Sequence, residues 1–176
     1  MAGYTHLDEI IDYNNLVISK ILESSEVMKL VSNGRYTPDD DDAEKWEDHI
    51  NDHGWIDESV QEAGAYVLVD TEVTKAPSGS IKRMTLLVEV VCNKSFMKLD
   101  SDRFPGVKGN RRDNICRQID LLINGSSEFG VGRLQLSSAT LAAAPEGFTA
   151  RLLTYTVPDY ARDRARVLPL YLLSLI

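Results

Sequence analysis

The sequence predicts an α+β protein, with a mainly antiparallel sheet and helices packed on one of its faces. Three observations lead to this fold class. Apolar residues recur at helical spacing from Leu7 to Val31, two pairs of β-forming segments follow, and an amphipathic helix is expected between the pairs. Within one domain we expect a helical region with an acidic loop over 1–64, an α+β core over 65–160 and a C-terminal arm over 161–176.

The N-terminal region is expected to form one helix or two helices with a bend. The apolar stripe is interrupted at Ser24–Glu26, where a serine can cap a second short helix. Asn33-Gly34 then supplies a helix stop. An acidic loop leads into a further short helix over 43–50, which Gly54 would end.

The first strand pair follows at 65–73 and 84–91. The segment 65–73 is rich in β-formers. The segment 84–91 is almost continuously apolar, which is typical of a central strand. The first pair should therefore contain the middle of the sheet.

A helix and a second strand pair complete the predicted core. The helix covers 110–123 and ends at Asn124-Gly125. The strands 131–140 and 147–157 should form an antiparallel hairpin around a turn at 145–147. The helix is expected to face the sheet with Ile115, Ile119, Leu122 and Ile123.

Composition and charge restrict the functional classes. The chain of 176 residues is 43% hydrophobic and carries a net charge of −8, which disfavours a protein that grips nucleic acid. This charge is compatible with a ring through which DNA slides. Neither a signal peptide nor a transmembrane helix is expected, so the product should be intracellular. Cys92 and Cys116 are expected to be buried and reduced.

The strongest indication of enzymatic chemistry is a pair of histidines. His49 and His53 are four residues apart, so a helix would place both on one face, and Asp48, Asp52 or Asp57 could complete a zinc site. The simpler interpretation is two surface histidines near a helix end. No histidine lies between 66 and 157, so a nucleophile–base pair on a rigid element is hard to assemble. We expect no catalytic residues, no metal and no cofactor.

Charged runs indicate contacts with partners instead. The run Asp39, Asp40, Asp41 and Asp42 lacks the pattern of a calcium loop, so it should be solvated or face a partner. A second group of charges, Arg103, Lys108, Arg111 and Arg112, flanks the loop before the main helix. A third group alternates with other residues near the C-terminus and consists of Arg162, Arg164 and Arg166. These cations either solubilise an edge or contact an acidic partner or DNA phosphates.

The C-terminal segment 167–176 is unusually apolar. Such a patch must be buried, either on its own sheet or on a neighbouring subunit. Pro169 suits an edge or extended arm, and we expect an intermolecular arm. Together with the acidic run and the three C-terminal arginines, the candidate interface therefore includes Leu168, Leu170, Leu172, Leu173, Leu175 and Ile176.

Several segments together resemble a known family. Asp113–Gly125, Phe129–Leu134 and Arg151–Val157, with the opening helix Val17–Val31, resemble segments of phage tail-completion or neck proteins. The order of elements is similar to that of tail terminator proteins. The resemblance covers roughly residues 16–160. The acidic run and the apolar C-terminal segment have no counterpart in it.

The resemblance implies a structural role at the phage head–tail junction. It implies a subunit of a ring, commonly a hexamer, that joins connector or portal-adaptor proteins to tail-tube or sheath proteins and lets DNA pass. Such a protein is assembled in the host cytoplasm and resides in the virion, without membrane contact. Tail terminator and neck positions both remain open. The alternatives are a metal-dependent enzyme using His49 and His53, and a monomeric binding module.

Overall fold

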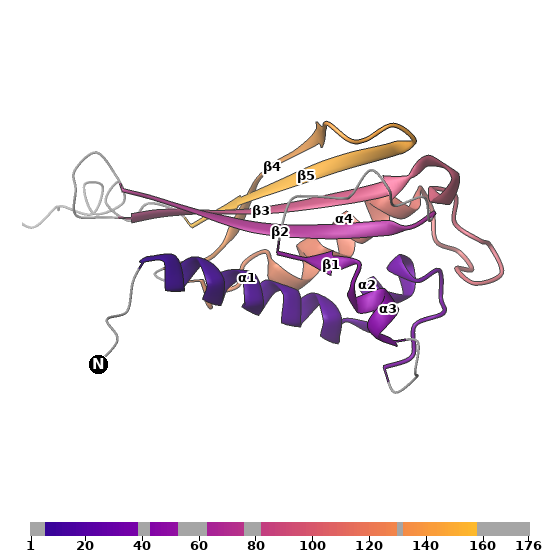
Figure 1. The fold of residues 1–176 in the computed structure, drawn as a ribbon, viewed down its shortest axis with the longest axis horizontal. Coiled ribbons are helices and arrows are strands. Elements are labelled where there is room, and N and C mark those ends of the chain that lie inside the picture. The colour runs from indigo at the N-terminus through magenta and orange to yellow at the C-terminus, as the bar shows by residue number, and fades with distance from the viewer. Residues whose placement is uncertain (1–5, 39–42, 53–62, 76–81, 130–131, 158–176) are drawn as a thin grey trace, which may run out of the picture.

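The computed structural model describes residues 6–38, 43–52, 63–75, 82–129 and 132–157. A five-stranded sheet lies over helices that all occupy the same side of it (Figure 1). The elements in chain order are α1 (His6–Glu23), α2 (Ser25–Val31), α3 (Ala43–Glu47), β1 (Ile50–Asn51), β2 (Ala65–Lys75), β3 (Lys82–Asn93), the 3-10 turn η1 (Lys94–Phe96), α4 (Arg111–Ile123), β4 (Gln135–Ala142) and β5 (Phe148–Thr156). The predicted α+β class, with helices on one face, is confirmed.

The sheet has the strand order β1-β2-β3-β5-β4. Only β1 pairs in parallel, with β2, and the other three pairings are antiparallel. The apolar strand β3 lies in the middle, as its sequence predicts. The hairpin β4–β5 is also confirmed, although β4 begins at Gln135 rather than near 131 and has an irregularity between Leu136 and Ser138.

The break between α1 and α2 follows from capping. The Ser24 hydroxyl accepts a hydrogen bond from the Val27 amide at 3.3 Å, which satisfies a free donor of the second helix. Helix α2 ends where Asn33 adopts a φ of 57° and the Gly34 amide donates to the Lys29 carbonyl at 2.7 Å. Both signals were readable in the sequence because caps involve only near neighbours.

The main core lies between the helices and one face of the sheet. Helix α1 contributes Val17 and Ile21, which are completely buried, and packs along β2. Helix α4 contributes its fully buried Ile115, Ile119 and Ile123, together with Cys116. The prediction for Leu122 is wrong, because its exposed fraction is 37%. Successive helical residues are rotated by about 100°, so Leu122 turns away from the face that Ile123 shares.

The segment after α3 also differs from the prediction. The helix ends at Glu47 instead of near Gly54, and the chain continues into β1, where Ile50 pairs with Val67. The Val67 amide donates to the His49 carbonyl at 2.8 Å. A parallel strand of two residues leaves no periodicity in the sequence, since its pairing depends on a strand that comes later in the chain.

Two further expectations concern burial and membranes. Cys92 and Cys116 are free and buried, as predicted, and burial raises their thiol pKa values to about 11 and about 12. Both thiols are therefore protonated at neutral pH. Within the described residues, no helix is both long enough and apolar enough to span a membrane.

Candidate functional site

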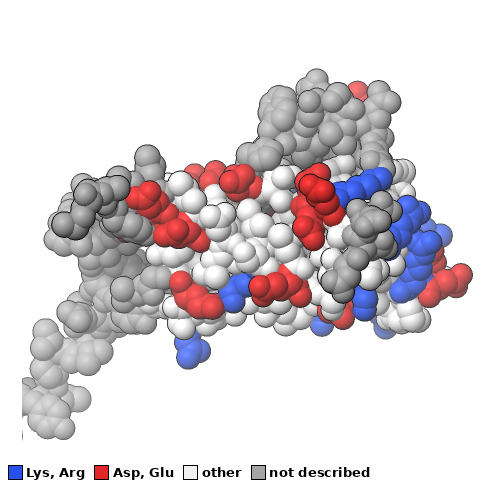
Figure 2. Space-filling model, turned by 60° about the horizontal axis from the view of Figure 1, so that its bottom comes forward, with Lys and Arg blue, Asp and Glu red and all other residues white. Residues whose placement is uncertain are grey.

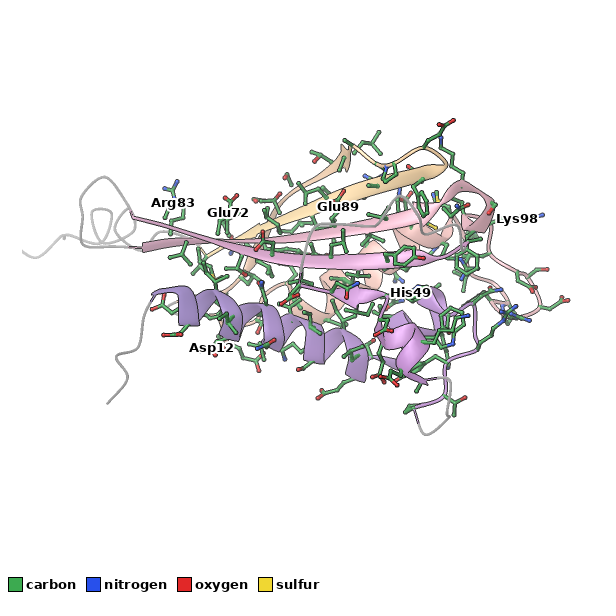
Figure 3. All side chains as sticks on the ribbon, in the orientation of Figure 1. Asp12, His49, Glu72, Arg83, Glu89 and Lys98 are labelled. Carbon is green, nitrogen blue, oxygen red and sulfur yellow. The ribbon has the colours of Figure 1, made fainter. Side chains whose placement is uncertain are left out.

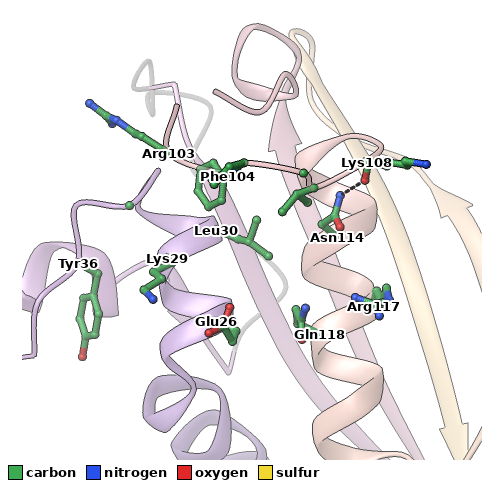
Figure 4. Close-up of a pocket in the computed structure, with 14 residues that line it drawn as sticks. Glu26, Lys29, Leu30, Tyr36, Arg103, Phe104, Lys108, Asn114, Arg117 and Gln118 are labelled. Atoms are coloured by element: carbon green, nitrogen blue, oxygen red, sulfur yellow. Dashed lines mark hydrogen bonds between the residues drawn. The ribbon is translucent and has the colours of Figure 1, made fainter. Parts of the chain in front are cut away.

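The candidate site is a groove of about 750 Å³ between α2 and α4, beneath the loop that precedes α4 (Figure 4). Helix α2 supplies Glu26, Lys29 and Leu30 to its wall. The opposite wall is formed by residues of α4, and the loop closes one end with Phe104 and Val107. Val107 is 43% exposed, so apolar surface is available at the mouth of the groove.

The groove is basic, although the chain as a whole is acidic. Among its lining residues a single acid, Glu26, faces four cations, namely Lys29, Arg103, Lys108 and Arg117. Figure 2 shows lysine and arginine side chains gathered at one end of this face, while acidic side chains lie over much of the rest. A concave surface with this charge favours an acidic partner.

The loop that roofs the groove is held in place by short-range hydrogen bonds. The Asn110 side chain caps α4 by accepting from the Asp113 amide at 2.9 Å. The Asn114 amide group donates to the Lys108 carbonyl at 2.9 Å, and the Arg103 guanidinium donates to the Asn33 carbonyl at 2.8 Å. Because these bonds hold the backbone, the positions of Arg103 and Lys108 are set by the fold.

Arg111 joins the elements on which the groove is built. Its exposed fraction is 1%, and its guanidinium donates to the Leu30 carbonyl at 2.6 Å, to the Phe96 carbonyl at 2.8 Å and to the Asn33 side-chain oxygen at 2.7 Å. The guanidinium also lies 4.1 Å from the centre of the Phe96 ring. One side chain thus connects the end of α2, the turn η1 and the start of α4. Burial lowers its pKa, but a guanidinium remains charged at any physiological pH.

Arg112 belongs to a second internal network. It donates to Asp113 at 3.0 Å and to the Thr149 hydroxyl at 2.6 Å, and Arg151 donates to the same Asp113 oxygen at 3.0 Å. Burial alone would raise the pKa of Asp113. Hydrogen bonds from Asn110 and Arg112 and the nearby positive charges outweigh burial, so its pKa is lowered.

The structure therefore divides the predicted basic group. Arg103 and Lys108 reach the groove, where Lys29 and Arg117 join them, but Arg111 and Arg112 are buried and bound within the chain. The expectation that these two arginines contact a partner is wrong. The sequence contained a signal for this outcome, because cations in the first turn of a helix oppose its dipole and need other partners.

His49 does not form the predicted metal site. It is buried after the end of α3, with its Nδ1 atom 2.9 Å from the Ala65 carbonyl oxygen and its ring stacked 4.4 Å from that of Tyr66 (Figure 3). The surface interpretation is also wrong for this residue. His53 and Asp57 lie outside the described residues, and the described part of the chain contains no group of three or more potential metal-ligating side chains.

The other predicted interface residues lie outside the described part of the chain. They are Asp39, Asp40, Asp41, Asp42, Arg162, Arg164, Arg166, Leu168, Leu170, Leu172, Leu173, Leu175 and Ile176. Their assignment to an interface stays a prediction.

The fold and the groove define a class: a small α+β protein whose helix-covered sheet carries a preformed basic surface for an acidic partner. The family is shown by sequence comparison. The chain belongs to the YomW family, whose profile matches residues 24–157 and so includes every element from α2 to β5. No curated protein sequence matches the chain.

A solved structure shares the fold. It is a chain in the virion of a native gene transfer agent particle, which matches with a TM-score of 0.52. The match covers 88% of this chain and 97% of that chain, at 10% sequence identity. At this identity the similarity concerns the fold.

Proposed function

We propose that this protein is a structural subunit of a phage or phage-like virion. The observation that carries the proposal is the fold shared with a gene transfer agent virion chain, over nearly the whole length of that chain. Membership of the YomW family and the resemblance of 16–160 to phage tail-completion and neck proteins support the same role. The protein acts by occupying a place in a particle and has no catalytic activity.

The place we propose is the head–tail junction. There the protein forms a ring, a hexamer in the arrangement common among similar proteins, that joins connector proteins of the head to the tail and lets DNA pass. A net charge of −8 supports this role, because a lumen that bound phosphates strongly would retard DNA. The position is that of a tail terminator or of a neck protein.

The basic groove supplies a contact for a neighbouring connector or tail protein. Its four cations and its apolar floor fit an acidic segment that also carries an apolar side chain. A second contact links subunits of the ring through Arg162, Arg164 and Arg166 and the run Asp39–Asp42 of the next copy. Complementary charges of this kind set register and partner choice more than affinity.

A nonsense allele in a phage that carries this gene tests the proposal. We expect DNA-filled heads and separate tails in electron micrographs, and recovery of joined particles when the wild-type gene is supplied from a plasmid. Overlong tails would assign the terminator position, because nothing would stop tail growth. Tails of normal length with heads that lose DNA would assign the neck position.

The same experiment can contradict the proposal. Joined, infectious particles made without the protein would exclude a role at the junction. Mass spectrometry of purified wild-type particles provides a second readout, since a ring subunit must be present in several copies per virion. Its absence from particles would exclude the structural role altogether.

A further inference from the structure

Strand β4 is an outer strand of the sheet. It occupies one end of the order β1-β2-β3-β5-β4, and within the described residues no strand pairs with its outer side. The opposite end of the sheet is the two-residue strand β1. The eight residues of β4 therefore present the longer edge, with backbone donors and acceptors that can pair with another chain.

The sequence of β4 lacks the usual protection of an edge. Its residues, QLSSATLA, include no charged side chain and no proline, which are the residues that normally discourage strand addition. The irregularity between Leu136 and Ser138 disturbs only the beginning of the strand. The pairing from Ala139 to Ala142 is regular, so the second half of the edge is suited to accept a strand.

The side chains along this half leave room for large neighbours. Ala139 and Thr140 are small and exposed, and Leu141 is 71% exposed, the largest exposed fraction among the exposed large hydrophobic residues of the described chain. Cross-strand neighbours on a sheet contact each other directly, so a strand added here would cover Leu141. The edge thus offers both backbone pairing and apolar contact.

We propose that segment 167–176 of a second copy of this chain binds as an added strand along the outer side of β4. The segment, VLPLYLLSLI, is apolar, uncharged and long enough to cover the eight residues of β4. Pro169 is tolerated because an added strand is paired on one side only. The edge and the segment are therefore complementary in length and chemistry, as in other complexes that form by strand addition.

The second copy follows from the proposed function, on which this inference rests. A ring requires a heterologous contact, in which one surface of each subunit binds a different surface of the next. An arm at the C-terminus and an edge at β4 are two such surfaces. Each subunit then donates one arm and receives one, and the exchange closes only when the ring is complete.

Isotope-resolved crosslinking tests which copy supplies the strand. Full-length protein carrying Leu141→Cys with Leu172→Cys is prepared in natural and ¹⁵N-labelled form, mixed at high concentration and oxidised. The native Cys92 and Cys116 are buried and do not compete. We expect a disulfide between positions 141 and 172 in which about half of the linked peptide pairs combine the two isotopes, as random exchange between copies requires.

The matched control moves the receiving cysteine to α4. Leu121 is 65% exposed, close to the value for Leu141, so Leu121→Cys with Leu172→Cys differs mainly in place. Only background crosslinking is expected from it. A 141–172 disulfide in pure-isotope pairs alone would mean that the segment binds its own subunit, and equal crosslinking at 121 and 141, or none at 141, would mean that β4 is not the receptor. Each of these results overturns the inference.

Particle assembly separates failure of this inference from failure of the proposed function. Leu141→Lys should reduce virion incorporation at least tenfold, whereas Leu121→Lys should be incorporated like wild type. Equal incorporation of both variants would refute the role of β4 and leave the structural role intact. If the wild-type protein is absent from virions, the structural role fails, and the crosslinking result alone decides whether the strand is added.

Discussion

The junction around Arg111 and the edge at β4 treat polar groups in opposite ways. At the junction, three acceptors from α2, the α2–α3 connection and η1 are satisfied by one buried guanidinium. At the edge, no described strand pairs with the outer backbone groups of β4, and Leu141 projects into solvent. A substitution at the junction should therefore damage folding, and one at the edge should damage assembly.

The comparison teaches how one chain can separate its stability from its interactions. Removing a buried donor leaves acceptors without partners, and each unsatisfied group costs about 1–3 kcal/mol. Changing an exposed side chain costs within about 0.5 kcal/mol in the isolated subunit. The basic groove combines both cases, because buried Arg111 builds its walls and exposed Arg117 lines its surface.

The largest effect on folding is expected for Ile119→Asp. Ile119 is completely buried on the face of α4 that packs on the sheet, so the carboxylate would have no partner. The free energy of unfolding should fall by at least about 4 kcal/mol, measured by urea denaturation followed by circular dichroism. The control Leu121→Asp changes an exposed residue two positions away and should unfold like wild type. Cooperative unfolding of Ile119→Asp near the wild-type midpoint would show that this face of α4 is not in the core.

Arg111→Met should come next, and it breaks the junction directly. The apolar side chain preserves much of the volume but leaves the Leu30 and Phe96 carbonyls without their donor. We expect a loss of about 3–5 kcal/mol in the free energy of unfolding. Arg111→Lys should recover only part of it, because an ammonium group cannot reproduce the planar fork. A loss for Arg111→Met no larger than that for exposed Arg117→Met would contradict the importance of this junction.

A charge reversal in the groove sharpens the comparison without touching the core. Arg117→Glu should leave the unfolding free energy within about 0.5 kcal/mol of wild type, since the side chain is exposed. It should reduce virion incorporation by about tenfold, because a like charge would face the acidic partner. The matched control is Arg83→Glu, also exposed but at the far end of the sheet from Lys98 (Figure 3). Quantitative mass spectrometry of purified particles measures both, and equal incorporation would remove the groove from the interface.

The smallest effect concerns Glu89 on the face of the sheet opposite the helices. Partial burial raises the pKa of this carboxyl above its ordinary value of 4.5. The folded state then holds the proton more strongly than the unfolded state, so stability falls as pH rises from 4.5 through the raised pKa. Glu89→Gln should therefore unfold at slightly higher urea concentration at pH 7. The difference from wild type should disappear below pH 4.5, and a difference that stays constant with pH would rule out this cause.

Much of the fold could be predicted because its signals are local. The Ser24 cap, the stop at Asn33-Gly34 and the apolar strand β3 each depend on residues within one or two turns of chain. The sheet face of α4 was predicted at Ile115 and Ile119 for the same reason. The error at Leu122 arose because four apolar residues were available for a face that only some of them could share.

The site could be predicted only in part. Arg103 and Lys108 were expected beside a functional loop, but Lys29 and Arg117 enter the groove because α2 and α4 pack together. His49 looked like a surface residue or a ligand until β1 paired with β2 and placed it against Tyr66. In each case the deciding neighbour is distant in sequence or belongs to an element that was not foreseen.

By itself, the sequence determined the α+β class, the order of the main elements, the acidic balance of the chain and the apolar C-terminal segment. Only the tertiary structure decided which arginines are internal and which are available to a partner. Arg111 reaches the Leu30 carbonyl, 81 residues away in the chain, whereas nearby Arg117 stays exposed. Periodicity and caps are encoded between near neighbours, but the partner of a buried charge is chosen by packing across the whole domain, and no local pattern reports it.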